Sequence, residues 1–117
     1  MDINNCIDLC VINNTDYDIS LVVFKILEGK YRYISNNAWE YLDKDNNWVS
    51  DTKQNNFKYS IKTEVYTYFI KRAIELCDKT NDANIMSNKL LIISSKLKED
   101  KYISTMIKES RQFFLDE

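Results

Sequence analysis

The feature that most constrains the fold of this chain is residues 39–49, where its two tryptophans flank a run of Asp, Lys and Asn. The flanking segments alternate apolar and polar residues, and the run between them is rich in turn formers. The pattern predicts a β-hairpin. A four-residue turn at 43–46 places Tyr41 opposite Trp48, so that Trp39, Tyr41 and Trp48 share one face. Such a cluster either packs on a helix or holds a ligand.

Helical periodicity precedes the hairpin. Residues 19–27 are almost entirely apolar, and Asp16 or Asp18 is a suitable N-cap. Gly29, the one glycine of the chain, stands where the end of a helix favours left-handed backbone. The apolar stretch at 6–12 is compatible with a strand or with a helical turn, and its pattern does not decide between them.

Three further helices are predicted in the second half, where apolar residues recur at spacings of three and four within 57–76, 86–97 and 100–114. Short connections favour antiparallel packing of successive helices. Strands are expected within 31–50. The predicted class is therefore α+β and mostly α, with an N-terminal helix, a small antiparallel aromatic β-meander and a C-terminal helical bundle.

A chain of 117 residues with 44% hydrophobic and 29% charged residues is typical of one globular domain. We expect an N-terminal extension at 1–15 and a single domain at 16–117. An end directly on Phe113-Phe114-Leu115 indicates a domain excised from a longer protein. One glycine and no proline predict long helices and few turns with positive φ.

The net charge of −2 does not direct the whole chain to nucleic acid or to an anionic membrane. Three cysteines, an odd number, fit a reducing compartment. No signal peptide is visible, and no apolar run approaches the roughly 18 to 20 residues that span a bilayer. We expect a cytoplasmic protein that is not secreted and has no membrane partner.

The sequence offers little for catalysis. A phosphate-binding loop needs several glycines, and Gly29 stands alone. There is no histidine to serve as a general base near neutral pH. Cys6, Cys10 and Cys77 lack the paired spacing and the fourth donor of a zinc site. We therefore expect no catalytic residue, no metal site and no cofactor in this segment.

The aromatic hairpin and the basic second half are the candidate contact surfaces. Trp39, Tyr41 or Trp48 would stack on bases or on a partner while basic residues such as Arg32 meet phosphates. The competing interpretation is that these rings close a small core, which is the commoner fate of large aromatics. Candidate contact residues for a nucleic-acid backbone or a partner are Trp39, Tyr41, Trp48, Arg32, Lys89 and Lys96.

From Asp18 onward the order of motifs resembles the domain that lies between primase and helicase in the primase–helicases of poxviruses and other large DNA viruses. The matching segments are the helix at 19–27, Tyr31-Arg32-Tyr33-Ile34, Trp39-Glu40-Tyr41, and Trp48 after a short Asp- and Asn-rich turn. A long helix and helical segments that close on Phe113-Phe114 complete the likeness, which covers roughly residues 17–117.

This resemblance implies a collar without an active site, which joins the primase to a superfamily 3 helicase motor and supports a hexameric ring around DNA. ATP binding and unwinding would belong to the downstream motor of the parent protein, an ATP-dependent helicase–primase. The expected partners are further copies of the chain, that motor and the DNA backbone, at a viral replication site in the host cytoplasm.

Two alternatives stay open. The chain is then a stand-alone viral adaptor that binds a protein through the aromatic hairpin, or a small single-stranded nucleic-acid binder. The second needs an exposed tryptophan or Tyr41, and it predicts fluorescence quenching by an oligonucleotide with strong salt dependence.

Overall fold

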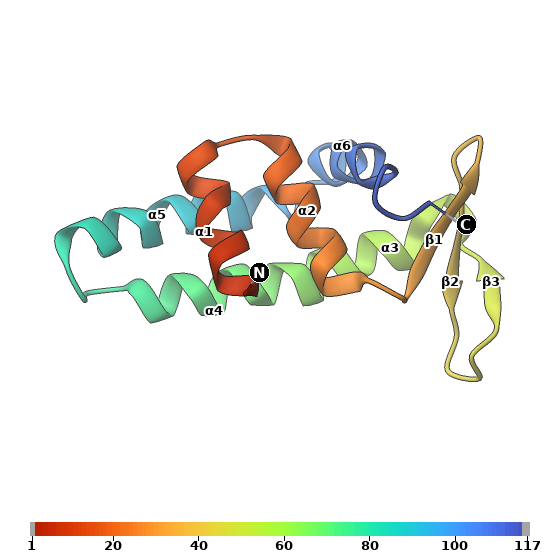
Figure 1. Cartoon of the computed structure of the whole chain (residues 1–117), viewed down its shortest axis with the longest axis horizontal. Helices are drawn as coiled ribbons and strands as arrows, with labels where there is room; N and C mark the ends of the chain where they lie inside the picture. Colours follow the sequence, from red (N-terminus) through yellow and green to blue (C-terminus); the bar gives the residue numbers. More distant parts are fainter. Residues whose placement is uncertain (1, 116–117) are drawn as a thin grey trace.

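The computed structural model describes residues 2–115, which form an elongated molecule of 46 × 26 × 24 Å (Figure 1). Helices α4 and α5 run along the long axis, and the sheet lies at one end. The predicted class, α+β and mostly α, is confirmed. The elements are α1 (Ile3–Asn13), α2 (Asp16–Leu27), β1 (Tyr31–Ser35), β2 (Ala38–Leu42), β3 (Trp48–Ser50), the 3-10 turn η1 (Thr52–Gln54), α3 (Asn55–Ser60), the π-helical segment η2 (Ile61–Val65), α4 (Tyr66–Leu76), α5 (Asn81–Lys96) and α6 (Asp100–Ser110).

Helix α1 resolves the ambiguous stretch at 6–12 as helix. Its buried residues Cys6, Ile7 and Cys10 belong to the same core as the rest of the chain. Helix α1 packs against α2, α4 and α5. The residues that we expected to form an N-terminal extension therefore contain a helix that shares the common core.

The N-cap of helix α2 lies one residue before Asp16, the first of the two predicted caps. Thr15 is the N-cap, and its hydroxyl accepts the backbone N–H of Asp18 at 3.2 Å. Thr occupies this position because its short side chain reaches an N–H group that the helix leaves unpaired. Gly29 has φ +83°, as predicted for the residue that ends this helix.

Helices α3 and α4 are joined through η2 into one continuous rod at 55–76. Its buried residues Phe57, Ile61, Val65, Phe69 and Ala73 recur at a strict spacing of four. In a regular α-helix, with 3.6 residues per turn, each such step drifts by about 40° around the axis. The wider π-helical turn rotates less per residue and brings the later residues back toward the core.

The three strands form an antiparallel sheet in the order β1-β2-β3, as predicted for the meander. One face carries Tyr31, Tyr33, Trp39 and Tyr41, because Tyr31 is paired with Tyr41 and Tyr33 with Trp39. This inner face packs against the helical core, in which Phe57 contacts both Tyr31 and Trp39 at ring-centroid distances of 4.7 Å.

Asp51 joins the sheet to the helical rod. It is buried, and its carboxylate accepts the backbone N–H groups of Asn56 at 2.8 Å and of Phe57 at 3.0 Å. Its own N–H donates to the carbonyl of Trp39 at 2.8 Å. The negative charge thus lies at the start of α3, where unpaired N–H groups and the helix dipole favour it.

The expectation of few positive-φ residues was wrong. Within residues 2–115 seven non-glycine residues have positive φ: Asn14, Asn36, Asn37, Asn46, Lys53, Gln54 and Asp78. Asparagine tolerates this conformation better than most residues because its short polar side chain can bond to the local backbone. The Asn pairs therefore serve the turns for which glycine is usually required.

The C-terminal helices are packed differently from a simple three-helix bundle. Helices α4 and α5 are side by side, and the hydroxyl of Ser87 donates to the carbonyl of Ala73 at 2.7 Å. Helix α6 packs mainly against α2 and α3. No helix within residues 2–115 is long and apolar enough to cross a membrane.

Candidate functional site

The β2–β3 loop is one residue longer than the turn predicted at 43–46. The N–H of Asp43 donates to the carbonyl of Asn47, and the Asp43 carboxylate accepts the N–H groups of Asp45 and Asn47, each at 2.9 Å. Asn46 has φ +62°, and the loop spans the five residues 43–47, closed by the pair of Asp43 and Asn47. The extra residue shifts the strand register.

The prediction that both tryptophans share one face is therefore wrong. Trp48 lies opposite Leu42 and not opposite Tyr41, which faces Val49. Because side chains alternate along a strand, a shift of one residue moves Trp48 to the other face of the sheet. Trp39 and Tyr41 face the core, and Trp48 faces away from it.

Trp39 is a core residue. It is 2% exposed, and its ring contacts those of Tyr33, Phe57 and Phe114 at centroid distances of 5.2, 4.7 and 5.6 Å. Tyr41 is half-buried against the same core. A base cannot stack on the Trp39 ring unless this end of the molecule opens.

Arg32 and Trp48 lie together on the outer face. The Arg32 guanidinium carbon is 4.4 Å from the centroid of the Trp48 ring, and its Nε donates to Glu40 at 2.7 Å. Arg32 thus forms a cation–π contact with Trp48 and an ion pair with Glu40. Trp48 stays half-buried.

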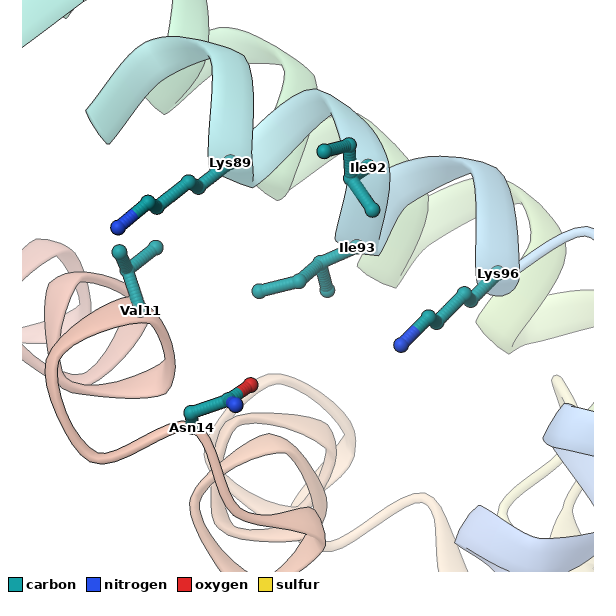
Figure 2. A pocket seen from close by; sticks show the side chains of 6 residues that line it. All are labelled: Val11, Asn14, Lys89, Ile92, Ile93 and Lys96. Atoms are coloured by element: carbon teal, nitrogen blue, oxygen red, sulfur yellow. The ribbon is translucent and has the colours of Figure 1, made fainter. Parts of the chain in front are cut away.

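Lys89 and Lys96, the other two candidate contact residues, line one pocket of about 330 Å³ between α5 and the turn that joins α1 to α2. Figure 2 shows both lysines extending from α5 toward this turn, on either side of Ile93. Val11, Asn14 and Ile92 complete the lining. We call this pocket the α1–α5 groove.

The groove combines apolar walls with unpaired positive charge. Ile92 is 61% exposed, whereas its neighbour Ile93 belongs to the core. Within residues 2–115 neither lysine forms an ion pair; the Lys96 ammonium lies 5.6 Å from the centroid of the Tyr102 ring. Asn14 has φ +53°, and its N–H caps α1 by donating to Cys10. The groove therefore suits an occupant that is both apolar and acidic.

A residue pattern in α5 points to this groove. Ile85, Lys89, Ile92 and Lys96 are spaced at i, i+4, i+7 and i+11 and share one side of the helix. The predicted apolar stripe of Met86, Leu90, Ile93 and Leu97 lies beside it. The core uses the stripe of Met86, Leu90, Ile93 and Leu97, so the isoleucines of the neighbouring set, Ile85 and Ile92, stay exposed. The sequence interpretation identified the core stripe but missed the neighbouring set that contains Ile85 and Ile92.

Two of the cysteines have thiol pKa values above the ordinary range, which favours the thiol over the nucleophilic thiolate. Burial raises the pKa of Cys10, whose Sγ donates to the carbonyl of Cys6 at 3.4 Å, so the thiol stays protonated. Cys77 is exposed, and the neighbouring Asp78 carboxylate raises its pKa. Within the part of the chain that the structure describes, no group of His, Cys, Asp or Glu residues is arranged to hold a metal ion.

No family model matches this sequence, and comparisons with curated proteins and with solved structures find no similar protein either. The candidate site therefore rests on its own geometry.

Proposed function

We propose that this chain is a non-catalytic collar domain of a viral replicative primase–helicase, which supports hexameric ring assembly around DNA and couples to the helicase motor. Two things support the proposal. The resemblance described above places helix, aromatic meander and helical segments in the order found along this chain. The α1–α5 groove then supplies a surface on which neighbouring subunits can pack.

The groove is the observation that carries the proposal. Ile12, Ile85 and Ile92 are 64%, 54% and 61% exposed, and they lie on the two helices that border the groove. Of these three, Ile92 lines the groove itself, and an exposed apolar side chain in a concave surface suits an interaction site. In a ring each subunit offers two different surfaces to its neighbours, so an unused face of this kind is what a collar requires.

The lysines give the same surface a second role. Lys89 and Lys96 stand two helical turns apart, about 10 Å along α5. Both carry charge that no carboxylate within residues 2–115 neutralises. Such charges attract an acidic neighbour or a DNA backbone, and salt weakens both interactions.

Sedimentation velocity of the chain across a range of concentrations, with and without single-stranded DNA, tests the proposal. We expect a concentration-dependent species of several subunits, which DNA shifts to lower protein concentrations. The double variant Lys89→Glu/Lys96→Glu should lose the effect of DNA, and Lys44→Glu/Lys71→Glu, with the same change of charge at exposed positions, should keep it. A monomer at every concentration, indifferent to DNA, would contradict the collar function.

A further inference from the structure

A second cavity, of about 280 Å³, lies between α6 and the β1–β2 turn. Its lining comes from the β1–β2 turn, from β2, from η1, and from α6 with the residue that follows it. Trp39 and Ile107 provide the apolar part of the lining. The rest is polar, and it has no carboxylate.

Three polar residues line this cavity from one side: two lie on α6, and the third directly follows its last residue, Ser110. Ser104, Lys108 and Arg111 are spaced at i, i+4 and i+7. Lysine and arginine only donate hydrogen bonds, and the serine hydroxyl can donate one. Gln54 adds an amide on the opposite side. The cavity is therefore rich in donors.

The two cations of this cavity are unpaired, in contrast to other cations of the chain. Arg72, Lys62 and Lys30 each form an ion pair with a carboxylate. Within residues 2–115 Lys108 and Arg111 form none. Their charge is left for another acidic group.

The Arg111 side chain is held by an aromatic ring and one hydrogen bond, but not all of its donors are satisfied. Its guanidinium lies 5.2 Å from the centroid of the Tyr33 ring, and one terminal nitrogen donates to the side-chain oxygen of Asn37. Its Nε is buried, and no atom of residues 2–115 forms a hydrogen bond with it. A buried donor without an acceptor is unfavourable, so an acceptor brought by a ligand would stabilise it.

The wall opposite α6 is built from two turns in unusual backbone conformations. Asn36 and Asn37 have φ +48° and +65°, and Lys53 and Gln54 have φ +54° and +55°. The Gln54 amide donates to the carbonyl of Asn37 at 2.9 Å and ties the turns together. For Lys53 and Gln54 this conformation is strained, and it is the one that brings Gln54 to the cavity.

We infer that this cavity is a phosphate-binding site formed by Arg111, Lys108, Ser104 and Gln54. An arginine whose plane is fixed by an aromatic ring matches the oxygens of a phosphate group, and a nearby lysine adds charge. The phosphate comes either from a nucleic-acid backbone or from free phosphate. The site does not depend on the proposed collar function, because it lies apart from the α1–α5 groove.

Another explanation needs no ligand. Cations near the C-terminal end of a helix interact favourably with the helix dipole. In that case Lys108 and Arg111 stabilise α6, and the chain has no preference for phosphate.

Nuclear magnetic resonance on the ¹⁵N-labelled chain separates these explanations, because the Nε–H of Arg111 gives its own signal. Three probes are titrated: inorganic phosphate, pentathymidylate, and the same pentamer with an uncharged methylphosphonate backbone. We expect the Arg111 Nε–H and the amide signals of Asn37 and Gln54 to shift with a charged probe and not with the neutral pentamer. Saturation by pentathymidylate at lower concentration identifies the nucleic-acid backbone as the source; saturation by inorganic phosphate at lower concentration identifies free phosphate.

Two variants and a control complete the test. Lys108→Gln, an exposed position that should not affect folding, and Arg111→Lys, which keeps the charge but loses Nε–H, should each weaken binding about tenfold. Lys101→Gln makes the same change of charge on α6 outside the cavity and should bind like the parent chain. No shift with either charged probe, or equal affinity in all variants, would overturn the assignment.

Discussion

The aromatic end of the molecule and the α1–α5 groove use large apolar side chains in opposite ways. Trp39 is 2% exposed and contacts three other rings, whereas Ile92 is 61% exposed at the edge of a pocket. The aromatic cluster is conspicuous in the sequence, but most of its side chains are buried in the core or packed against it. The side chains left for a partner are the less conspicuous ones that α5 carries beyond its core stripe.

The two tryptophans provide the sharpest test of this difference. We expect Trp39→Ala to lower the free energy of unfolding by about 3–5 kcal/mol, because it leaves a cavity among packed rings. Trp48→Ala removes the same side chain from the outer face and should cost about 1–2 kcal/mol through the lost contact with Arg32. Urea denaturation followed by circular dichroism measures both. Equal losses would break the distinction between the two faces of the sheet.

Asp51 carries the link between the aromatic end and the helical rod. Asp51→Ala leaves the N–H groups of Asn56 and Phe57 without their acceptor, and we expect a loss of about 2–3 kcal/mol. Asp51→Asn keeps one acceptor oxygen and should lose less. Thermal unfolding of the two variants measures the difference. A stable Asp51→Ala protein would show that sheet and rod do not depend on this cap.

The ion pair between Asp8 and Arg72 connects α1 to α4, in the helical part of the molecule that contains the α1–α5 groove. Arg72 donates to both carboxylate oxygens at 2.9 and 2.8 Å, and the hydrogen bonds with Asp8 raise the Arg72 pKa. Since both side chains are 19% exposed, Asp8→Asn should cost only about 1–2 kcal/mol. Urea midpoints of the parent chain and the variant test this. A loss above that of Trp39→Ala would mean that the helical packing depends more on this pair than on the aromatic core.

Substitutions in the groove should have the smallest effect on folding. Ile92→Glu changes an exposed side chain, and we expect the free energy of unfolding to stay within about 0.5 kcal/mol of the parent value. Calorimetric unfolding at low protein concentration measures this. A loss of 2 kcal/mol or more would show that Ile92 belongs to the core and would remove the groove as an interaction surface.

The sequence predicts the fold class because its periodicities are strong. The strands around Trp39 and the helix that ends before Gly29 are present as expected. The face of Trp48 was not predictable, because it depends on the length of one loop. The Asp43 carboxylate holds a loop that is one residue longer than predicted, and the extra residue moves Trp48 to the outer face of the sheet.

The groove shows a second limit. Lys89 and Lys96 are candidates from the sequence because of their charge and their place near a predicted turn between helices. Both lysines line the groove together with Val11 and Asn14 because of the way α1 crosses α5. No local sequence pattern predicts that crossing. The spacing of Ile85 and Ile92 on one side of α5 is the local pattern that indicates an exposed apolar surface. The cavity at α6 joins residues more than 50 positions apart, and only the tertiary structure reveals it.

The most direct test of the account compares the sedimentation of Ile92→Glu with that of Ile74→Glu at the highest protein concentration that is soluble. Both replace an exposed isoleucine, at 61% and 67% exposure, by glutamate, but Ile74 lies on α4 outside the groove. The account predicts that Ile92→Glu sediments as a monomer while Ile74→Glu assembles like the parent chain. Equal assembly of the two variants would contradict the claim that subunits meet through the α1–α5 groove.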